Sequence, residues 1–395
     1  MRRCRGFLLA VLLTAPSVAP ATEAGGATPD KPPAAAAAVE YQRKLAAYKQ
    51  ARQKFDDEAS VYWNAVAQKR RLRTAKRRDH LDVLIDDYVL TQPPLYTGPP
   101  PPRLAAPAGE NEREAPETPP RKYIPVVADF LKSALEHFGF APQRPKSEID
   151  FKRAYAKAAL AAGLTKEQIV RVYAFETGGN GTYDAQAGRE YSPTARAVSP
   201  ALGYNQLLNT NSVELLAERG DELVAALRTK AAGSTGEPRQ ALESKIEVLR
   251  QMIKFCRTVP DDWTQHDVLA NTPKGLGVHA MLLDIDIGPL LQTQKLLDSV
   301  VFARRKGYHA PLSAAELEMM NLTGDGNGLD MLMMPATMRE RVPTANFFLQ
   351  LGYERNPVAI RNNVVARLLA AANASMDRRV NLQGAKDLAA ALSAR

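Results

Sequence analysis

The chain has 395 residues, of which 45% are hydrophobic and 24% charged. This is the composition of a globular protein with one large or two ordinary domains, and it excludes a fibrous or wholly disordered chain. The net charge of +9 suits a polyanionic partner such as nucleic acid, an anionic membrane or a cell-wall polymer. The chain carries no nucleic-acid-binding motif, so we expect no nucleic-acid partner.

Residues 1–21 predict a secretory signal peptide. Three arginines precede an apolar run at residues 6–13, and a small-residue cleavage site follows at residues 19–21. The run is too short to span a bilayer, so we expect a mature chain that is periplasmic and has no transmembrane segment. Without this leader Cys256 is the one remaining cysteine, which excludes an intramolecular disulfide.

An amphipathic, coiled-coil-like helix is predicted for residues 41–90, after an Ala/Pro/Thr-rich disordered stretch at residues 22–40. Its seam repeats at alternating spacings of four and three through Tyr41, Leu45, Tyr48, Phe55, Ala59, Tyr62 and Val66, with Arg52 in the slot between Tyr48 and Phe55. Two interpretations stay open: the helix folds back on the body of the protein, or it self-associates through residues 41–78. The basic run at residues 69–78 is either a solvated face or a contact with anionic lipid or cell wall.

A proline-rich linker follows at residues 91–122. Residues 91–120 contain ten of the chain's 28 prolines, a composition that favours an extended spacer. We therefore place the main domain boundary here.

The remaining residues, 123–376, predict an all-α domain with helices around a central groove, followed by a C-terminal tail at 377–395. Apolar residues recur at helical spacing and strand patterns are absent. The predicted helices cover residues 124–137, 147–162, 165–176, 207–227, 241–255, 278–297, 314–320, 343–351 and 358–374.

The helix at residues 165–176 ends in an acidic residue. Thr165 and Gln168 predict a capping box at its start, and Arg171 is expected to point at water. Glycines follow Glu176 after one residue and predict the helix end. A carboxylate is disfavoured at the C-terminal end of a helix and among apolar neighbours, so we expect a raised pKa for Glu176, which suits a general acid.

The segment Ser-Pro-Ala-Leu-Gly-Tyr-Asn-Gln-Leu-Leu at residues 199–208 follows a Gly/Asn/Asp-rich loop. Together with Glu176-Thr177 it resembles the lysozyme-like lytic transglycosylases and goose-type lysozymes. Gly203 and Gln206 match the glycine and glutamine of that family, Thr177 stands where serine is usual, and Tyr204 and Asn205 replace Leu-Met.

The resemblance implies a lysozyme-like helical catalytic domain in which Glu176 is the catalytic acid. It also implies that Thr177 and Gln206 orient that acid or bind the sugar's N-acetyl group, and that Gly203 lets the backbone approach the glycan. Tyr204 would then border the sugar-binding groove.

A second, weaker similarity lies further along the chain. The segment at residues 315–324 resembles the family's Ala-Tyr-Asn-Ala-Gly segment, with Asn321 and Gly324 matching and Met320 in the place of a tyrosine. Tyr353 is a candidate to replace that tyrosine, so Asn321 and Tyr353 are predicted substrate-binding residues.

The resemblance implies a lytic transglycosylase that cleaves peptidoglycan glycan strands, with one glutamate as both acid and base and a 1,6-anhydro product. A muramidase that uses water is the enzymatic alternative, and its second acid would be Asp184 or Glu190. A non-catalytic wall-binding or scaffold protein on the same fold is the alternative from another class.

No metal site or cofactor is expected. The stretch Asp-Gly-Asn-Gly-Leu-Asp at residues 325–330 lacks the glycine and the glutamate that an EF-hand needs, and a tight turn explains it better. The five histidines show no paired spacing for zinc.

Overall fold

The structure, a computed structural model, describes residues 34–102, 123–189 and 194–394. Within these ranges the chain is helical and holds no strand, which confirms the all-α class. Isolated antiparallel bridges join Leu202 to Gln186 and to Leu207. The predicted signal peptide and residues 103–122 of the predicted linker lie outside the described residues.

The described residues divide into two compact units. The first contains residues 124–340 and 364–394, and the second contains residues 34–102 together with residues 341–363. The sequence placed residues 341–363 in the domain 123–376, so the structure assigns this segment differently. No helix among the described residues is long and apolar enough to cross a membrane.

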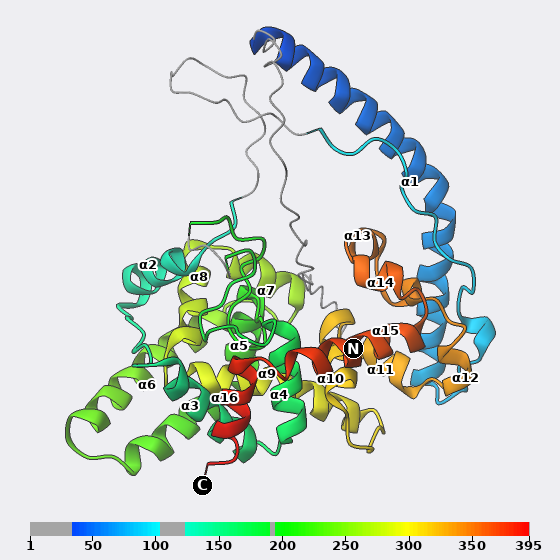
Figure 1. Cartoon of the computed structure of the whole chain (residues 1–395). Helices are drawn as coiled ribbons and strands as arrows, with labels where there is room; N and C mark the ends of the chain where they lie inside the picture. The colour runs from blue at the N-terminus through cyan, green and yellow to red at the C-terminus, as the bar shows by residue number, and fades with distance from the viewer. Residues whose placement is uncertain (1–33, 103–122, 190–193, 395) are drawn as a thin grey trace, which may run out of the picture. The chain divides into compact units, whose positions relative to one another are not determined.

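The second unit is built on the long helix α1 (Ala34–Arg78; Figure 1). The smaller elements are η1 (Ile85–Asp87), η3 (Thr344–Phe347), α13 (Gln350–Glu354) and α14 (Pro357–Arg361). The predicted helix therefore ends at Arg78 and not near residue 90. His80, just after it, has a left-handed backbone with φ 56°.

Residues of the same unit contact aromatic side chains of α1, both on the predicted seam and beside it. The ring of Tyr96 lies edge-on to Tyr48 and Phe55, with centroids 6.2 and 5.4 Å away. Trp63 packs on Tyr353, with ring centroids 5.9 Å apart. These aromatic side chains of α1 thus have partners within the second unit, and self-association through residues 41–78 stays a prediction.

Two arginines of the basic run, the half-buried Arg70 and the buried Arg73, make structural contacts. Arg73 is fully buried, donates to the carbonyl oxygens of Asp87 (3.0 Å) and Asn346 (3.3 Å), and lies 4.2 Å from the ring centroid of Tyr88. Arg70 also donates to the Asn346 carbonyl, at 3.0 Å. Desolvation lowers the pKa of both guanidinium groups to about 10. These contacts attach residues 346–348 to α1.

We predict that Arg73→Leu lowers the unfolding free energy of this unit by about 2–3 kcal/mol, because two buried carbonyl oxygens lose charged donors. The measurement is denaturant unfolding followed by the fluorescence of Trp63 in a Trp263→Phe background, since the chain has two tryptophans. The control is Arg71→Leu, an exposed neighbour, for which we expect a change within about 0.5 kcal/mol. Equal effects of the two variants would contradict the structural role of Arg73.

The first unit consists of helices packed around two apolar regions. One region holds the buried residues of α2, α5, α6, α8, η2 and α9, while α4 packs against α3, α10, α15 and α16 in the other. The helices are α2 (Val127–Phe138), α3 (Glu148–Ala161), α4 (Lys166–Glu176), α5 (Asn209–Ala232), α6 (Gly236–Cys256), α7 (Trp263–Ala270), α8 (Pro273–His279), η2 (Ala280–Leu283), α9 (Gly288–Arg305), α10 (Ala314–Thr323), α11 (Asp325–Met333), α12 (Ala336–Arg339), α15 (Val365–Arg379) and α16 (Gln383–Ala391).

Several predicted elements differ from the structure. The helix expected at residues 343–351 is divided into η3 and α13, and the one expected at 358–374 into α14 and α15. The single helix expected at residues 278–297 is interrupted, because the buried carboxylate of Asp284 accepts from the backbone amides of Gln143 (2.8 Å) and Asp286 (2.9 Å). The expected turn at residues 325–330 begins α11. The expected C-terminal tail contains α16, which packs on α3 and α4 (Figure 1).

Candidate functional site

Helix α4 begins with the capping box that the sequence predicts. The Gln168 amide donates to the hydroxyl of Thr165 at 3.1 Å, and the Thr165 amide donates to the side-chain oxygen of Gln168 at 2.9 Å. Both interactions satisfy backbone N–H groups that the first turn of a helix leaves free. The cap fixes the residue at which α4 starts.

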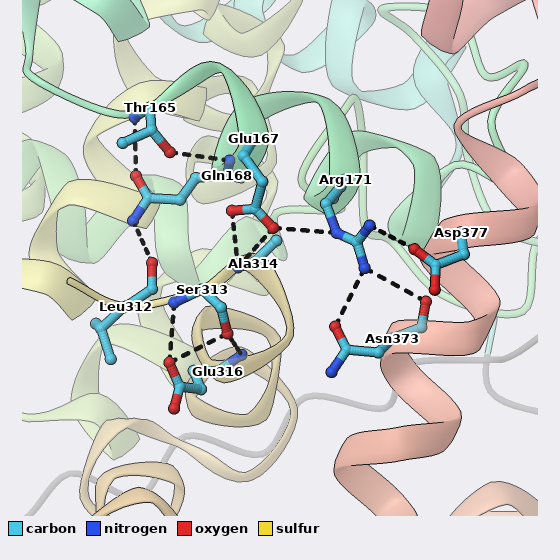
Figure 2. A network of polar contacts seen from close by, with 10 residues as sticks. All are labelled: Thr165, Glu167, Gln168, Arg171, Leu312, Ser313, Ala314, Glu316, Asn373 and Asp377. Carbon is cyan, nitrogen blue, oxygen red and sulfur yellow. Dashed lines mark hydrogen bonds and ion pairs between the residues drawn. The ribbon is translucent and has the colours of Figure 1, made fainter.

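Polar side chains of α4 connect it to α15 and to the start of α10 (Figure 2). The side-chain amide of Gln168 donates to the Leu312 carbonyl at 2.7 Å. The carboxylate of Glu167 accepts from the backbone amide of Ala314 at 3.3 Å. Arg171, expected to point at water, forms ion pairs with Glu167 (3.1 Å) and Asp377 (2.6 Å). The prediction for Arg171 is wrong because α15 packs beside α4 and supplies an acid.

Glu176 is the last residue of α4 and the centre of the candidate site. Its Oε1 accepts a 2.6 Å hydrogen bond from Nδ2 of Asn321 on α10. The side chain is half-buried, while Phe175 before it is buried. Burial raises the pKa of Glu176 to about 7, and the hydrogen bonds that its carboxyl receives act in the opposite direction. The predicted rise in pKa thus has desolvation as its main cause.

Glu318 of α10 is a second acid at this site, and the sequence analysis missed it. Its side chain is fully buried and contacts the carboxyl group of Glu176. Burial and the neighbouring Glu176 raise the pKa of Glu318 well above its usual range. The signal was present in the sequence, because Glu318 lies between Leu317 and Met319, among apolar neighbours like those that singled out Glu176.

Two cations act on this acid pair. The ammonium group of Lys295 on α9 favours the ionised forms of both Glu176 and Glu318, and Arg379 on α15 favours that of Glu176. Lys295 also acts on Glu214, whose pKa burial raises to about 7. The positive charge of Lys295 therefore interacts with several carboxyl groups and does not stabilise Glu176 alone.

Thr177 and the glycines after it close α4. The hydroxyl of Thr177 donates to the Tyr173 carbonyl at 2.7 Å, so it is bound to its own helix and not to Glu176. Gly179 has φ +86°, and a Cβ there would lie 2.6 Å from the Arg379 carbonyl oxygen. The sharp chain reversal after Glu176 therefore needs glycine at this position.

The matched segment at residues 203–206 is packed into the core of this unit. Tyr204 is fully buried and its hydroxyl donates to Glu148, while the amide N–H of Asn205 donates to Oε1 of Gln292 at 2.9 Å. Gln206 donates from its side chain to the backbone carbonyls of Ala185 (3.1 Å) and Gly203 (2.8 Å). The side chains of Tyr204 and Gln206 thus bind groups of the protein itself and support the loop.

The other predicted residues have partners of their own or lie outside the described residues. Asp184 forms an ion pair with Arg144 and accepts from the Thr182 hydroxyl at 2.8 Å. Tyr353 belongs to the second unit, where it is buried against Trp63 and Phe348. Glu190 lies outside the described residues.

No protein-family model, curated protein or solved structure matches the chain. Among the described residues, no three or more His, Cys, Asp or Glu side chains come together in a group that could hold a metal ion. The site is therefore characterised by its own geometry: an acid pair, the amide of Asn321, and the cations Lys295 and Arg379.

We predict that Asn321→Ala raises the pKa of Glu176 by about one unit, because the carboxylate loses a charged hydrogen bond worth about 1.5 kcal/mol. The measurement is a ¹³C-carboxyl NMR titration. The carboxyl resonance that is missing from the spectrum of the Glu176→Gln variant is the one assigned to Glu176. The control is Asn373→Ala. It removes a side-chain amide of α15 whose oxygen accepts from Arg171, and it should leave the pKa of Glu176 unchanged. A pKa that is unchanged or lowered in Asn321→Ala would contradict this role.

We predict that Gly203→Ala lowers the unfolding free energy by about 2–4 kcal/mol. The added Cβ would lie 2.1 Å from Nε2 of the buried Gln292, and φ is +78°. Gly307→Ala is the matched control, because φ there is +85° and no heavy atom lies within 4 Å of its Cβ. Denaturant unfolding should show only the backbone cost, about 1 kcal/mol, at Gly307.

Proposed function

We propose that the chain is a peptidoglycan lytic transglycosylase of the lysozyme-like superfamily, exported to the periplasm. Its substrate would be the β-1,4 bond between N-acetylmuramic acid and N-acetylglucosamine in glycan strands. Glu176 would be the acid and the base of the reaction. The proposal rests on the resemblance around Glu176 together with the properties of its carboxyl group.

The observation that carries the proposal is the environment of Glu176. A half-buried carboxyl with a pKa of about 7 is populated both with and without its proton near neutral pH. That suits a group which first protonates the glycosidic oxygen and then takes the proton of the sugar's C6 hydroxyl. Asn321 donates to Oε1 of Glu176, and Oε2 of Glu176 takes no part in this hydrogen bond.

The contact between the two acids favours one-acid chemistry over the muramidase alternative. A two-carboxylate glycosidase needs its carboxyl groups about 5 Å or more apart, on the two faces of the sugar. Glu318 contacts Glu176 directly and is fully buried, so it cannot lie on the opposite face of a bound sugar. Asp184 is already paired with Arg144.

We predict that residues 22–395 release muropeptides from purified murein sacculi, and that Glu176→Gln reduces the rate by at least about 10²-fold, because the variant lacks the acid. Mass spectrometry would show products lighter by one water than reducing-end muropeptides. The matched control is Glu237→Gln, an exposed glutamate of the same unit, which should retain the wild-type rate.

Each other outcome points to a different function. Reducing-end products would replace the transglycosylase with a muramidase. Equal release by wild type and Glu176→Gln would contradict the role of Glu176. Binding to sacculi without any products, weakened by salt, would support a wall-binding scaffold instead.

A further inference from the structure

Glu318 lies one turn before Asn321 on the same face of α10, and Asn321 donates to Oε1 of Glu176 on α4 at 2.6 Å. The carboxyl groups of Glu176 and Glu318 therefore meet between these two helices. Glu318 is fully buried, and neither of its oxygens receives a hydrogen bond from an N–H or O–H donor of the described residues. Its polar contact is the carboxyl of Glu176. Two carboxylates cannot hydrogen-bond to each other, so the contact requires a proton on one of them.

The two acids differ in their access to water. Glu176 is half-buried, whereas Glu318 has no exposed surface. Burying an ionised carboxyl without hydrogen-bond donors costs far more than burying a neutral one. The neutral form is therefore favoured at Glu318, and Glu176 is the member that can carry charge next to solvent.

The surrounding charges do not remove this difference. From α9 the ammonium of Lys295 acts on both acids, and from α15 Arg379 acts on Glu176 but not on Glu318. Lys295 also acts on Glu214 of α5 and Asp325 of α11. Its charge is thus divided among four acids, and the second cation stabilises negative charge at Glu176 alone.

We propose that Glu318 is a positioning residue that stays protonated and donates its O–H to the carboxylate of Glu176. The hydrogen bond itself does not depend on the proposed function, but its catalytic meaning rests on it. A buried carboxylic acid that is kept neutral to donate a hydrogen bond is an established device in proton-transfer sites.

The proton balance of the proposed reaction then involves Glu176 only. Its O–H bond breaks and the proton goes to the glycosidic oxygen as the C1–O bond breaks. The C6 hydroxyl oxygen of the same sugar forms the new bond to C1, and its proton returns to Glu176. Glu318 keeps its proton throughout and stabilises the Glu176 carboxylate between the two steps.

The test compares two substitutions at Glu318 by ¹³C-carboxyl NMR titration of Glu176, which needs no substrate. Glu318→Gln retains an N–H donor, so we expect the pKa of Glu176 to stay within about half a unit of its wild-type value. Glu318→Met keeps the shape and removes the donor, so we expect that pKa to rise by about one unit or more. Glu214→Gln is the control. It removes another acid that interacts with Lys295 but leaves the pair of Glu176 and Glu318 intact.

The direction of the shift decides the question. If Glu318 is ionised, both variants remove a negative charge and the pKa of Glu176 falls by at least about one unit, which would overturn the proposal. If Glu318→Met does not fold, Glu318→Gln alone still decides between the two cases. An unchanged pKa of Glu176 indicates a protonated Glu318, and a lowered pKa indicates an ionised Glu318. A shift in Glu214→Gln as large as that in Glu318→Met would also overturn the direct hydrogen bond.

Activity on sacculi adds a second readout. Glu318→Gln should retain the pH profile of the wild type, whereas Glu318→Met should move its alkaline limb to higher pH and lower kcat with little change in KM. If the titrations follow expectation but sacculi stay intact, the transglycosylase proposal fails and the hydrogen bond from Glu318 stands.

Discussion

The desolvation of two carboxyl groups where α4 meets α10 is the constraint on which the site depends. A carboxyl that loses water must find a donor, a cation or a proton. Glu176 has the amide of Asn321 at 2.6 Å and the charges of Lys295 and Arg379. Glu318 has no donor of its own among the described residues, which makes its protonation the natural solution. The chemistry of Glu176 follows from this asymmetry.

The precision of this contact comes from interactions at the other end of α4. Gln168 and Glu167 bind the backbone that leads into α10, and Arg171 binds α15. These contacts fix how α4 lies against both helices, so the position of its last residue relative to α10 is set up to about two and a half turns away. A shift of one residue along either helix would separate the two acids.

The sequence predicts the helical class and the helix with the acid because both depend on local signals. The capping box of Thr165 and Gln168 and the position of Glu176 need only spacing and helix physics. The contact with Glu318 depends on which helices pack together, and no local pattern encodes that pairing. The same reason explains Tyr204, whose burial depends on the rings of α3 and α4 around it.

Long-range attachment also accounts for the difference in domain boundaries. Hydrophobic periodicity placed residues 341–363 with their sequence neighbours, but arginines of α1 bind the backbone of this segment from far away in the chain. Arg70 and Asn346 are separated by 276 positions. The proline content of residues 91–120 does not show which later residues return to α1.

The buried arginines of α1 have a consequence for biosynthesis. A chain made from its N-terminus exposes Arg70 and Arg73 long before the carbonyl groups that they bind have been synthesised. Until residues 346–348 emerge, these guanidinium groups remain hydrated and α1 lacks part of its packing surface. The second unit is therefore completed late in translation, although it contains the first helix of the described chain.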